Sequence, residues 1–211
     1  MELLIKNLTD AGLQRGLYTP AQAAVVLKEF AKLFPFENFD VVNQNKDKIT
    51  PEFIQNKMLK NRRGGLCYEL NSLLYLVLKE LGFEVSIGIG TVNLEGNWAT
   101  ERTHVIVLLQ IAGKKYIADT GFGNRLALYP LELNGGIVHS SAGSFKLRSL
   151  KTEKGSIAME MQNSSGEWEV HYAFNWNPEP WKELDRVKLD IHHRPQSAFN
   201  KVPLIATLLK D

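Results

Sequence analysis

The spacing of hydrophobic residues in the first third of the chain predicts three helices. Thr19 followed by Pro20 is typical of a helix start, in which threonine caps the first turn and proline takes its first position. Apolar residues then recur every three or four positions, and Thr50-Pro51 begins a second run of the same kind, which ends near Arg63. The same spacing predicts a third helix from Cys67 to Leu81.

After residue 82 the hydrophobic residues alternate with small or polar ones, which is the period of a β-strand. A turn at Gly113-Lys114 separates two of the strands. A short helix is expected from Asp185 to His192. Strands are predicted at Val85–Ile89, Val105–Ile111, Tyr116–Asp119, Ala127–Leu133, Ser144–Leu150, Ser156–Met161 and Glu167–Phe174.

These elements predict an α+β fold in which a helical bundle is followed by a small antiparallel β-barrel. The expected domains are a helical bundle over residues 1–83, a barrel over residues 84–184 and a C-terminal stretch over residues 185–211. A chain of 211 residues with 44% hydrophobic composition is large enough to bury such a core.

The charge of the chain is nearly balanced, because the formal net charge is only +2. This balance predicts neither a nucleic-acid partner nor an acidic membrane surface as a partner. A short basic run is interpreted as a solvated helix end, and consists of Lys57, Lys60, Arg62 and Arg63. The sequence shows neither a secretory signal nor a membrane-spanning run, so a cytoplasmic location is expected.

Cys67 is the single cysteine, so an intramolecular disulfide is excluded and the thiol is free for chemistry. The partial positive charge at a helix N-terminus favours a thiolate, and the N–H groups of the first turn can hold an oxyanion. Gly64 and Gly65 are expected to turn the backbone sharply and to leave open space above the sulfur. The alternative is a buried inert cysteine, against which the glycine-led helix start argues.

His104 at the start of one strand and Asp119 at the end of the next are candidates for the base and its orienting acid. With the turn at Gly113-Lys114, the two would share a face but lie offset by ~13 Å along a flat ladder. A bulge or bend is needed to close that gap. Taken singly, His104 fits a surface strand residue and Asp119 a turn aspartate, and the base role has four other candidates: His139, His171, His192 and His193.

Arg63-Gly64-Gly65-Leu66-Cys67-Tyr68-Glu69-Leu70-Asn71 resembles the RGGxCxExN signature around the nucleophile of arylamine N-acetyltransferases. Other blocks are similar to those of the same family in the same order. They are Pro35-Phe36-Glu37-Asn38-Phe39, Thr103-His104-Val105, Asp119-Thr120-Gly121-Phe122-Gly123 and, more weakly, Pro195-Gln196-Ser197-Ala198-Phe199.

The resemblance implies a papain-like triad in which Cys67 is the nucleophile, His104 the base and Asp119 the orienting acid. It also implies ping-pong transfer of an acetyl group from acetyl-CoA, as co-substrate, to an arylamine or arylhydrazine, without a metal. Such chemistry serves xenobiotic metabolism. A thiol hydrolase that uses the same triad is an alternative.

The resemblance further implies which residues surround the triad. Phe36, Phe39, Phe122 and Gly123 are expected to bind the aryl ring, with core packing as the alternative for Phe36 and Phe39. The residues expected to brace the site are Arg63, Gly64, Gly65, Glu37, Glu69, Asn71 and Thr103.

Members of the family continue beyond the last block into a third α/β segment that lies over the site, so this chain is interpreted as a shortened member with weak, altered or absent activity. A binding protein for small aromatic ligands or a partner chain is the non-enzymatic alternative. Val202–Leu209 is expected to be a strand without a partner, which would favour a homodimer. A metal site of Cys67, His192 and His193 is the weakest alternative.

Overall fold

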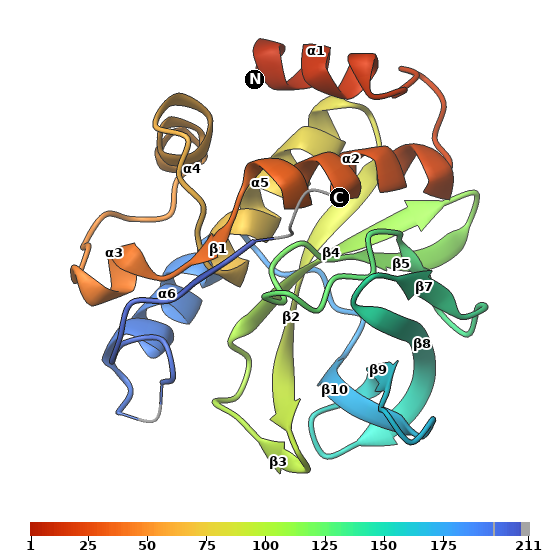
Figure 1. Ribbon diagram of the computed structural model, residues 1–211, viewed down its shortest axis with the longest axis vertical. Helices are drawn as coiled ribbons and strands as arrows, with labels where there is room; N and C mark the ends of the chain where they lie inside the picture. The colour runs from red at the N-terminus through yellow and green to blue at the C-terminus, as the bar shows by residue number, and fades with distance from the viewer. Residues whose placement is uncertain (196, 208–211) are drawn as a thin grey trace.

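The protein is a layer of helices packed on a strongly curved antiparallel sheet (Figure 1). The computed structural model describes residues 1–195 and 197–207. The helices are α1 (Glu2–Asp10), α2 (Pro20–Leu33), α3 (Phe39–Val42), α4 (Pro51–Gln55), α5 (Cys67–Glu80) and α6 (Glu183–His193).

The long strands form one sheet in the order β6-β5-β4-β2-β10-β9-β8-β7, with β3 paired on β2. Leu133 bridges to Leu147, which brings the end of β6 to β8 and leaves a nearly closed barrel. The predicted α+β fold with a small antiparallel barrel is therefore confirmed. The strands of this sheet are β2 (Glu84–Leu94), β3 (Asn97–Trp98), β4 (His104–Ile111), β5 (Lys114–Ala118), β6 (Leu131–Glu132), β7 (Val138–Ser140), β8 (Gly143–Thr152), β9 (Gly155–Gln162) and β10 (Trp168–Phe174).

The helix starts follow the local signals in the sequence. The Thr19 side chain accepts a hydrogen bond from Gln22 N at 3.3 Å, and the Thr50 side chain accepts one from Phe53 N at 3.0 Å. A proline follows each cap and takes the first helical position, where the missing N–H costs nothing. Both predicted starts are confirmed, as is the helix that begins at Cys67.

The second predicted helix is wrong in its later half. α4 ends at Gln55, and the chain continues as a π-helix, η1 (Asn56–Lys60), in which Asn61 N donates to Asn56 O at 3.0 Å. The extra residue in this wide turn rotates the side chains that follow it. Lys57 and Met58 are consequently both buried, although α-helical spacing would separate them by about 100°.

The predicted strand Ala127–Leu133 is also mostly wrong, because only β6 (Leu131–Glu132) forms. Leu128 has a φ of 58°, in the left-handed region that strands exclude. Pro130 has no N–H to donate to a neighbouring strand. The sheet therefore loses most of the expected strand to an irregular segment.

The C-terminal segment is not unpaired, contrary to expectation. β11 (Ile205–Ala206) pairs antiparallel with β1 (Phe36–Glu37). Asn38 Nδ2 donates to the carbonyl groups of Phe199 and Val202, each at 2.8 Å, so residues 199–206 are tied to the N-terminal part. Leu208 and Leu209 of the predicted strand lie outside the described residues, and a homodimer through this segment stays a prediction.

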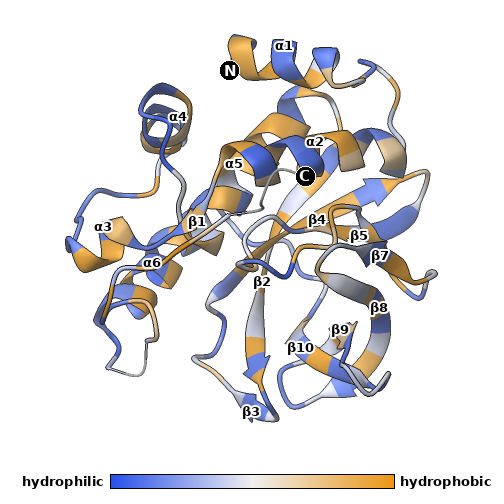
Figure 2. Ribbon diagram, viewed as in Figure 1, coloured by the Kyte–Doolittle hydropathy of each residue, from blue (hydrophilic) through white to orange (hydrophobic). Residues whose placement is uncertain are grey.

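β4 is the wall shared by the helical layer and the barrel. One set of its side chains packs with α2 and α5 in the first hydrophobic core, and the alternate set lines the barrel. The first set is Val105, Val107, Leu109 and Ile111, and the second is Ile106 and Leu108. Hydrophobic residues, orange in Figure 2, gather where α2 and α5 cross the sheet.

Because α5 and β4 share one core, the helices and the barrel are packed together without a linker between them. The division of the chain into three domains at residues 84 and 185 stays a prediction. Within residues 1–195 and 197–207, no helix combines the length and hydrophobicity needed to cross a lipid bilayer.

The two glycines before α5 permit close packing, and the expectation that they leave open space is wrong. A Cβ built on Gly64 would lie 1.8 Å from Pro35 O, and one on Gly65 would lie 2.6 Å from Glu69 Oε2. Gly65 N donates to Pro35 O at 3.2 Å, and Glu37 N donates to Gly65 O at 3.1 Å. The glycines therefore fasten the start of α5 to β1.

Gly64→Ala is expected to destabilise the protein by about 3 kcal/mol, because the new methyl group would overlap a backbone oxygen that no side-chain rotation can move. Urea unfolding of wild type and variant measures the difference. Gly136→Ala is the matched control, since Gly136 has open space around it and should change stability by less than about 1 kcal/mol. Equal effects of the two substitutions would contradict the close-packing role.

Candidate active site

The start of α5 places Cys67 at the junction of the helices and the barrel. Cys67 is the first residue of α5 and is only 7% exposed. Its Sγ lies 3.4 Å from the carbonyl oxygen of Thr103, to which the thiol donates. Glu69 Oε2 accepts the N–H of Leu66 at 3.0 Å and so closes the first turn of the helix.

His104 is the first residue of β4 and Asp119 directly follows β5, so the two strands of one hairpin present them. His104 Nε2 and Asp119 Oδ2 are 2.8 Å apart. This use of Nε2 leaves Nδ1 for Cys67, which is the other hydrogen-bond partner of the ring. The structure therefore brings together the three residues that the sequence singled out.

The predicted offset of ~13 Å between His104 and Asp119 is wrong, because the turn lies one residue earlier than expected. Ile111 pairs with Lys114, so the two-residue loop is Ala112-Gly113, with φ values of 50° and 77°. Two positive φ values in succession are typical of a type I′ hairpin turn. The corrected register leaves an offset of two residues, about 7 Å, which the two side chains span without a bulge.

The Asp119 carboxylate accepts four hydrogen bonds, and the partners come from three different elements and its own turn. Oδ1 accepts from Asn71 Nδ2 and from Gly121 N, each at 2.8 Å. Oδ2 accepts from His104 Nε2 at 2.8 Å and from Tyr172 Oη at 3.1 Å. A buried carboxylate with this many donors is held in its ionised form.

The electrostatics of the pair favour an imidazolium beside a carboxylate. Burial opposes a charge on His104, but the charge and hydrogen bond of Asp119, together with Cys67, raise the pKa of His104 from 6.5 to about 10. Burial raises the pKa of Asp119, yet His104, Asn71 and Gly121 outweigh it and bring that pKa below 3.8. An imidazolium next to a cysteine favours the nucleophilic thiolate.

Asn71 connects the helix to the turn that carries Asp119. Its Nδ2 also donates to Val105 O at 2.7 Å, and its Oδ1 accepts from Thr120 N at 2.8 Å. A Cβ on Gly121 would lie 2.5 Å from Cys67 Cα, so this turn packs directly against the first turn of α5. These hydrogen bonds are what a residue that braces the site would make, as was expected of Asn71.

Aromatic rings cover His104 on the barrel side. Its ring centroid lies 4.7 Å from that of Tyr172 and 5.1 Å from that of Phe122. Of the residues expected to bind an aryl ring, Phe122 is the one in ring contact with the triad. Phe36 instead packs on Phe199, with ring centroids 5.8 Å apart, and Phe39 lies beneath the guanidinium of Arg63.

A buried ion network lies behind α5. Two residues of the basic run, Lys57 and Arg63, belong to it, so their interpretation as part of a solvated helix end is wrong. Arg63 Nη2 is 2.8 Å from Glu37 Oε1, and Lys57 is buried among carboxylates. The sequence interpretation missed the roles of Lys57, Asp40 and Tyr172. In a regular α-helix with the observed spacing of apolar residues, Lys57 would lie on the surface. The π-helical turn is what buries its side chain.

The remaining histidines lie in other environments. His139 contacts Ser144 Oγ at 3.0 Å, His171 contacts Arg125 at 3.1 Å, and His192 contacts Tyr68 Oη at 3.1 Å. His193 lies beside His192, with ring centroids 6.1 Å apart. Among residues 1–195 and 197–207, no three His, Cys, Asp or Glu side chains are grouped to hold a metal ion.

Asp119→Asn is expected to remove the pH dependence of stability that His104 contributes. In the wild type, the folded pKa of about 10 exceeds the ordinary 6.5, so the stabilisation is complete below pH 6.5 and is lost as the pH rises through about 10. In the variant, burial would dominate and the pKa of His104 would fall below 6.5. Urea unfolding between pH 6.5 and 10.5 measures this slope.

Glu101→Gln is the control for that experiment, because Glu101 is exposed and, among the residues that the structure describes, pairs only with Lys154, at 3.3 Å. It should keep the wild-type slope. If Asp119→Asn also kept that slope, the ion pair would not be the source of the pH dependence.

Comparison with known proteins identifies the family. An N-acetyltransferase family model matches residues 23–211. The acetyltransferase YvcN of Bacillus subtilis is 43% identical over 185 residues, covering 86% of this chain and 72% of YvcN. The arylamine N-acetyltransferase of Escherichia coli is 30% identical over 179 residues, covering 84% of this chain and 62% of that enzyme. The chain thus spans less than two thirds of the Escherichia coli enzyme.

The fold agrees with this assignment. The crystal structure of an arylamine N-acetyltransferase from Bacillus cereus, an enzyme with a Cys-His-Glu catalytic triad, superposes with a TM-score of 0.91 at 32% identity. The alignment covers 100% of this chain and 82% of that one. Here the acid beside His104 is an aspartate, Asp119. On sequence and fold together, this chain belongs to the arylamine N-acetyltransferase family.

Proposed function

We propose that this protein transfers an acetyl group from acetyl-CoA to the nitrogen of an arylamine or arylhydrazine through a thioester on Cys67. The observation that carries the proposal is the contact of Cys67 with a His104 whose other nitrogen lies 2.8 Å from a buried carboxylate. A nucleophile, a base and an orienting acid in this order are what acyl transfer through cysteine requires.

In the first half-reaction the Cys67 thiolate attacks the carbonyl carbon of the acetyl thioester. The tetrahedral intermediate carries a negative oxygen, and backbone N–H groups at the start of α5 would stabilise it, because the first N–H groups of a helix have no intrahelical acceptor. When the intermediate collapses, the bond to the coenzyme A sulfur breaks, and His104 protonates that sulfur as it leaves. The enzyme is left with an acetyl group on Cys67 and a neutral imidazole.

In the second half-reaction the amine nitrogen attacks the acetyl carbon and His104 accepts its proton. Acetylation prepares His104 for this step, because the negative sulfur that helps to raise its pKa has become a neutral thioester. The Cys67 thiolate then leaves, the acetylated amine departs, and the starting ion pair is restored. Asp119 stays ionised throughout and keeps Nδ1 of His104 directed at the reacting atoms.

Intact-protein mass spectrometry after mixing with acetyl-CoA tests the first half-reaction. We expect one acetyl group per chain, and none in a Cys67→Ser variant. An arylamine added afterwards should remove the acetyl group and yield an equal amount of N-acetylated arylamine. Loss of the acetyl group at the same rate without acceptor would favour the hydrolase alternative, and failure to acquire it would favour the non-enzymatic one.

We propose that Phe122 forms part of the acceptor pocket, because its half-buried ring lies on the barrel side of His104. Phe122→Ala is expected to raise the KM for an arylamine by about three- to tenfold, the value of one aromatic contact, while acetylation of Cys67 changes little. Steady-state kinetics against acceptor concentration measure the effect. Tyr18→Ala is the control and should leave that KM unchanged, because Tyr18 is exposed and its ring contacts Phe83.

The remaining expectations about the biology stay predictions. They are a role in xenobiotic metabolism, a cytoplasmic location and the absence of a nucleic-acid or membrane partner.

A further inference from the structure

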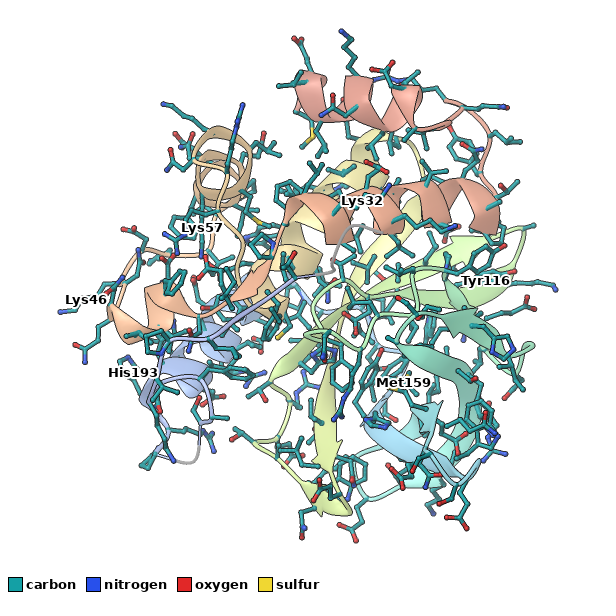
Figure 3. The ribbon with its side chains drawn as sticks, in the orientation of Figure 1. Lys32, Lys46, Lys57, Tyr116, Met159 and His193 are labelled. Carbon is teal, nitrogen blue, oxygen red and sulfur yellow. The ribbon has the colours of Figure 1, made fainter. Side chains whose placement is uncertain are left out.

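Lys57 is a buried lysine that the proposed reaction does not use. Its side chain is 5% exposed, and Nζ lies 2.6 Å from Glu69 Oε1, 2.8 Å from Asp40 Oδ2 and 3.9 Å from Glu37 Oε1. Figure 3 labels it between the turn of α4 and helix α3. Burying a lysine costs several kcal/mol unless charged partners surround it, as they do here.

Glu69 links Lys57 to the nucleophile. It is the third residue of α5, two positions after Cys67, and is 2% exposed. Oε1 accepts from Lys57, while Oε2 accepts the backbone N–H of Leu66 at 3.0 Å. One carboxylate therefore joins the π-helical turn to the backbone that carries the sulfur.

Lys57 offsets part of the negative charge of this cluster. The direct ion pairs join three carboxylates, those of Glu37, Asp40 and Glu69, to two cations, Lys57 and Arg63. Lys188 of α6 adds a positive charge that acts on Glu69 and Asp40 from outside these ion pairs. Removal of Lys57 would make the cluster more negative by one charge, and this charge beside the first turn of α5 would oppose a thiolate at Cys67.

The charged groups of α6 that face the cluster are Lys188 and His192. Lys188 Nζ lies 3.2 Å from Asn45 Oδ1 and also donates to Asp47 O, so its hydrogen bonds go to the segment before α4. Burial, together with the charges of Lys188 and His193, lowers the pKa of His192 to about 4, so His192 is neutral at pH 7. Within the described part of the chain, neither residue hydrogen-bonds to Glu69, so neither replaces Lys57.

We propose that Lys57 is a positioning residue for Cys67: it holds Glu69 on the Leu66 amide and offsets part of the carboxylate charge beside the sulfur. The inference rests on the proposed role of Cys67 as nucleophile.

The ionisation of the cluster agrees with this role. Burial raises the pKa of Glu69, and Lys57 opposes that rise. Burial would lower the pKa of Lys57, but Glu69 and Asp40 raise it, so the lysine carries its charge. Without Lys57, the carboxylate of Glu69 would remain beside the first turn of α5 as an anion without its nearest cation.

The test is the rate of alkylation of Cys67 by iodoacetamide between pH 4 and 9, which reports the thiolate directly because the chain has a single cysteine. In Lys57→Met the pH midpoint of the rate should rise by about one unit. In the double variant Lys57→Met/Glu69→Gln the midpoint should return to within a few tenths of a unit of wild type. Recovery on removing a second charged group is not expected of a lysine that only stabilises the fold.

Lys60→Met is the matched control, because Lys60 lies in the same π-helix but is exposed. It should keep the wild-type midpoint. A Lys57→Met midpoint equal to that of Lys60→Met, or a double variant no closer to wild type than Lys57→Met, would overturn the proposal.

If Lys57→Met does not fold, Glu69→Gln provides the test. Its midpoint should fall, because a negative charge beside the sulfur is gone, and an unchanged midpoint would overturn the proposal. Alkylation needs no acetyl-CoA, so the result stands apart from the proposed transferase activity. A wild type that is alkylated but never acetylated would refute that activity while leaving the role of Lys57 measurable.

Discussion

The buried carboxylate of Asp119 is the interaction on which the rest of the site depends. It is the point at which α5, β4 and β10 meet, through Asn71, His104 and Tyr172. Without it, His104 Nε2 and Tyr172 Oη would lose this acceptor and Asn71 Nδ2 would keep only Val105 O of its two, and unpaired buried polar groups are costly. The carboxylate therefore has two effects: it joins the helical layer to the barrel, and it keeps the proton on His104.

A second buried carboxylate, Glu69, acts on the other side of the nucleophile. Asp119 fixes the imidazole in front of the sulfur, whereas Glu69 fixes the backbone behind it. The thiol is thus held between two anionic groups, and each has a cation within 2.8 Å, His104 in one case and Lys57 in the other. Because each of these two carboxylates is paired with a cation, a third negative charge, the thiolate of Cys67, is compatible with a buried site.

Local signals were sufficient for much of the fold. Thr19 and Thr50 cap their helices through their own side chains, and strand alternation on both sides of a two-residue turn places His104 and Asp119 on one face. Contacts between segments that are distant in the sequence could not be predicted from these local signals. Tyr172 reaches Asp119 across 53 residues of sequence, and β11 pairs with β1 across about 170. The π-helical turn at Lys57 was missed because the spacing of apolar residues fits an α-helix equally well.

The hairpin turn at Ala112-Gly113 lies at the far end of β4 and β5 from the site, yet it sets which residues face each other there. Hairpin loops usually tolerate changes of length, since they lie at the surface and pack little. Here an inserted residue that shifted the ladder by one position, instead of lengthening the loop, would turn the carboxylate toward the opposite face of the sheet. A natural variant with such an insertion would lose the partner of its imidazole while every residue around the sulfur stayed the same.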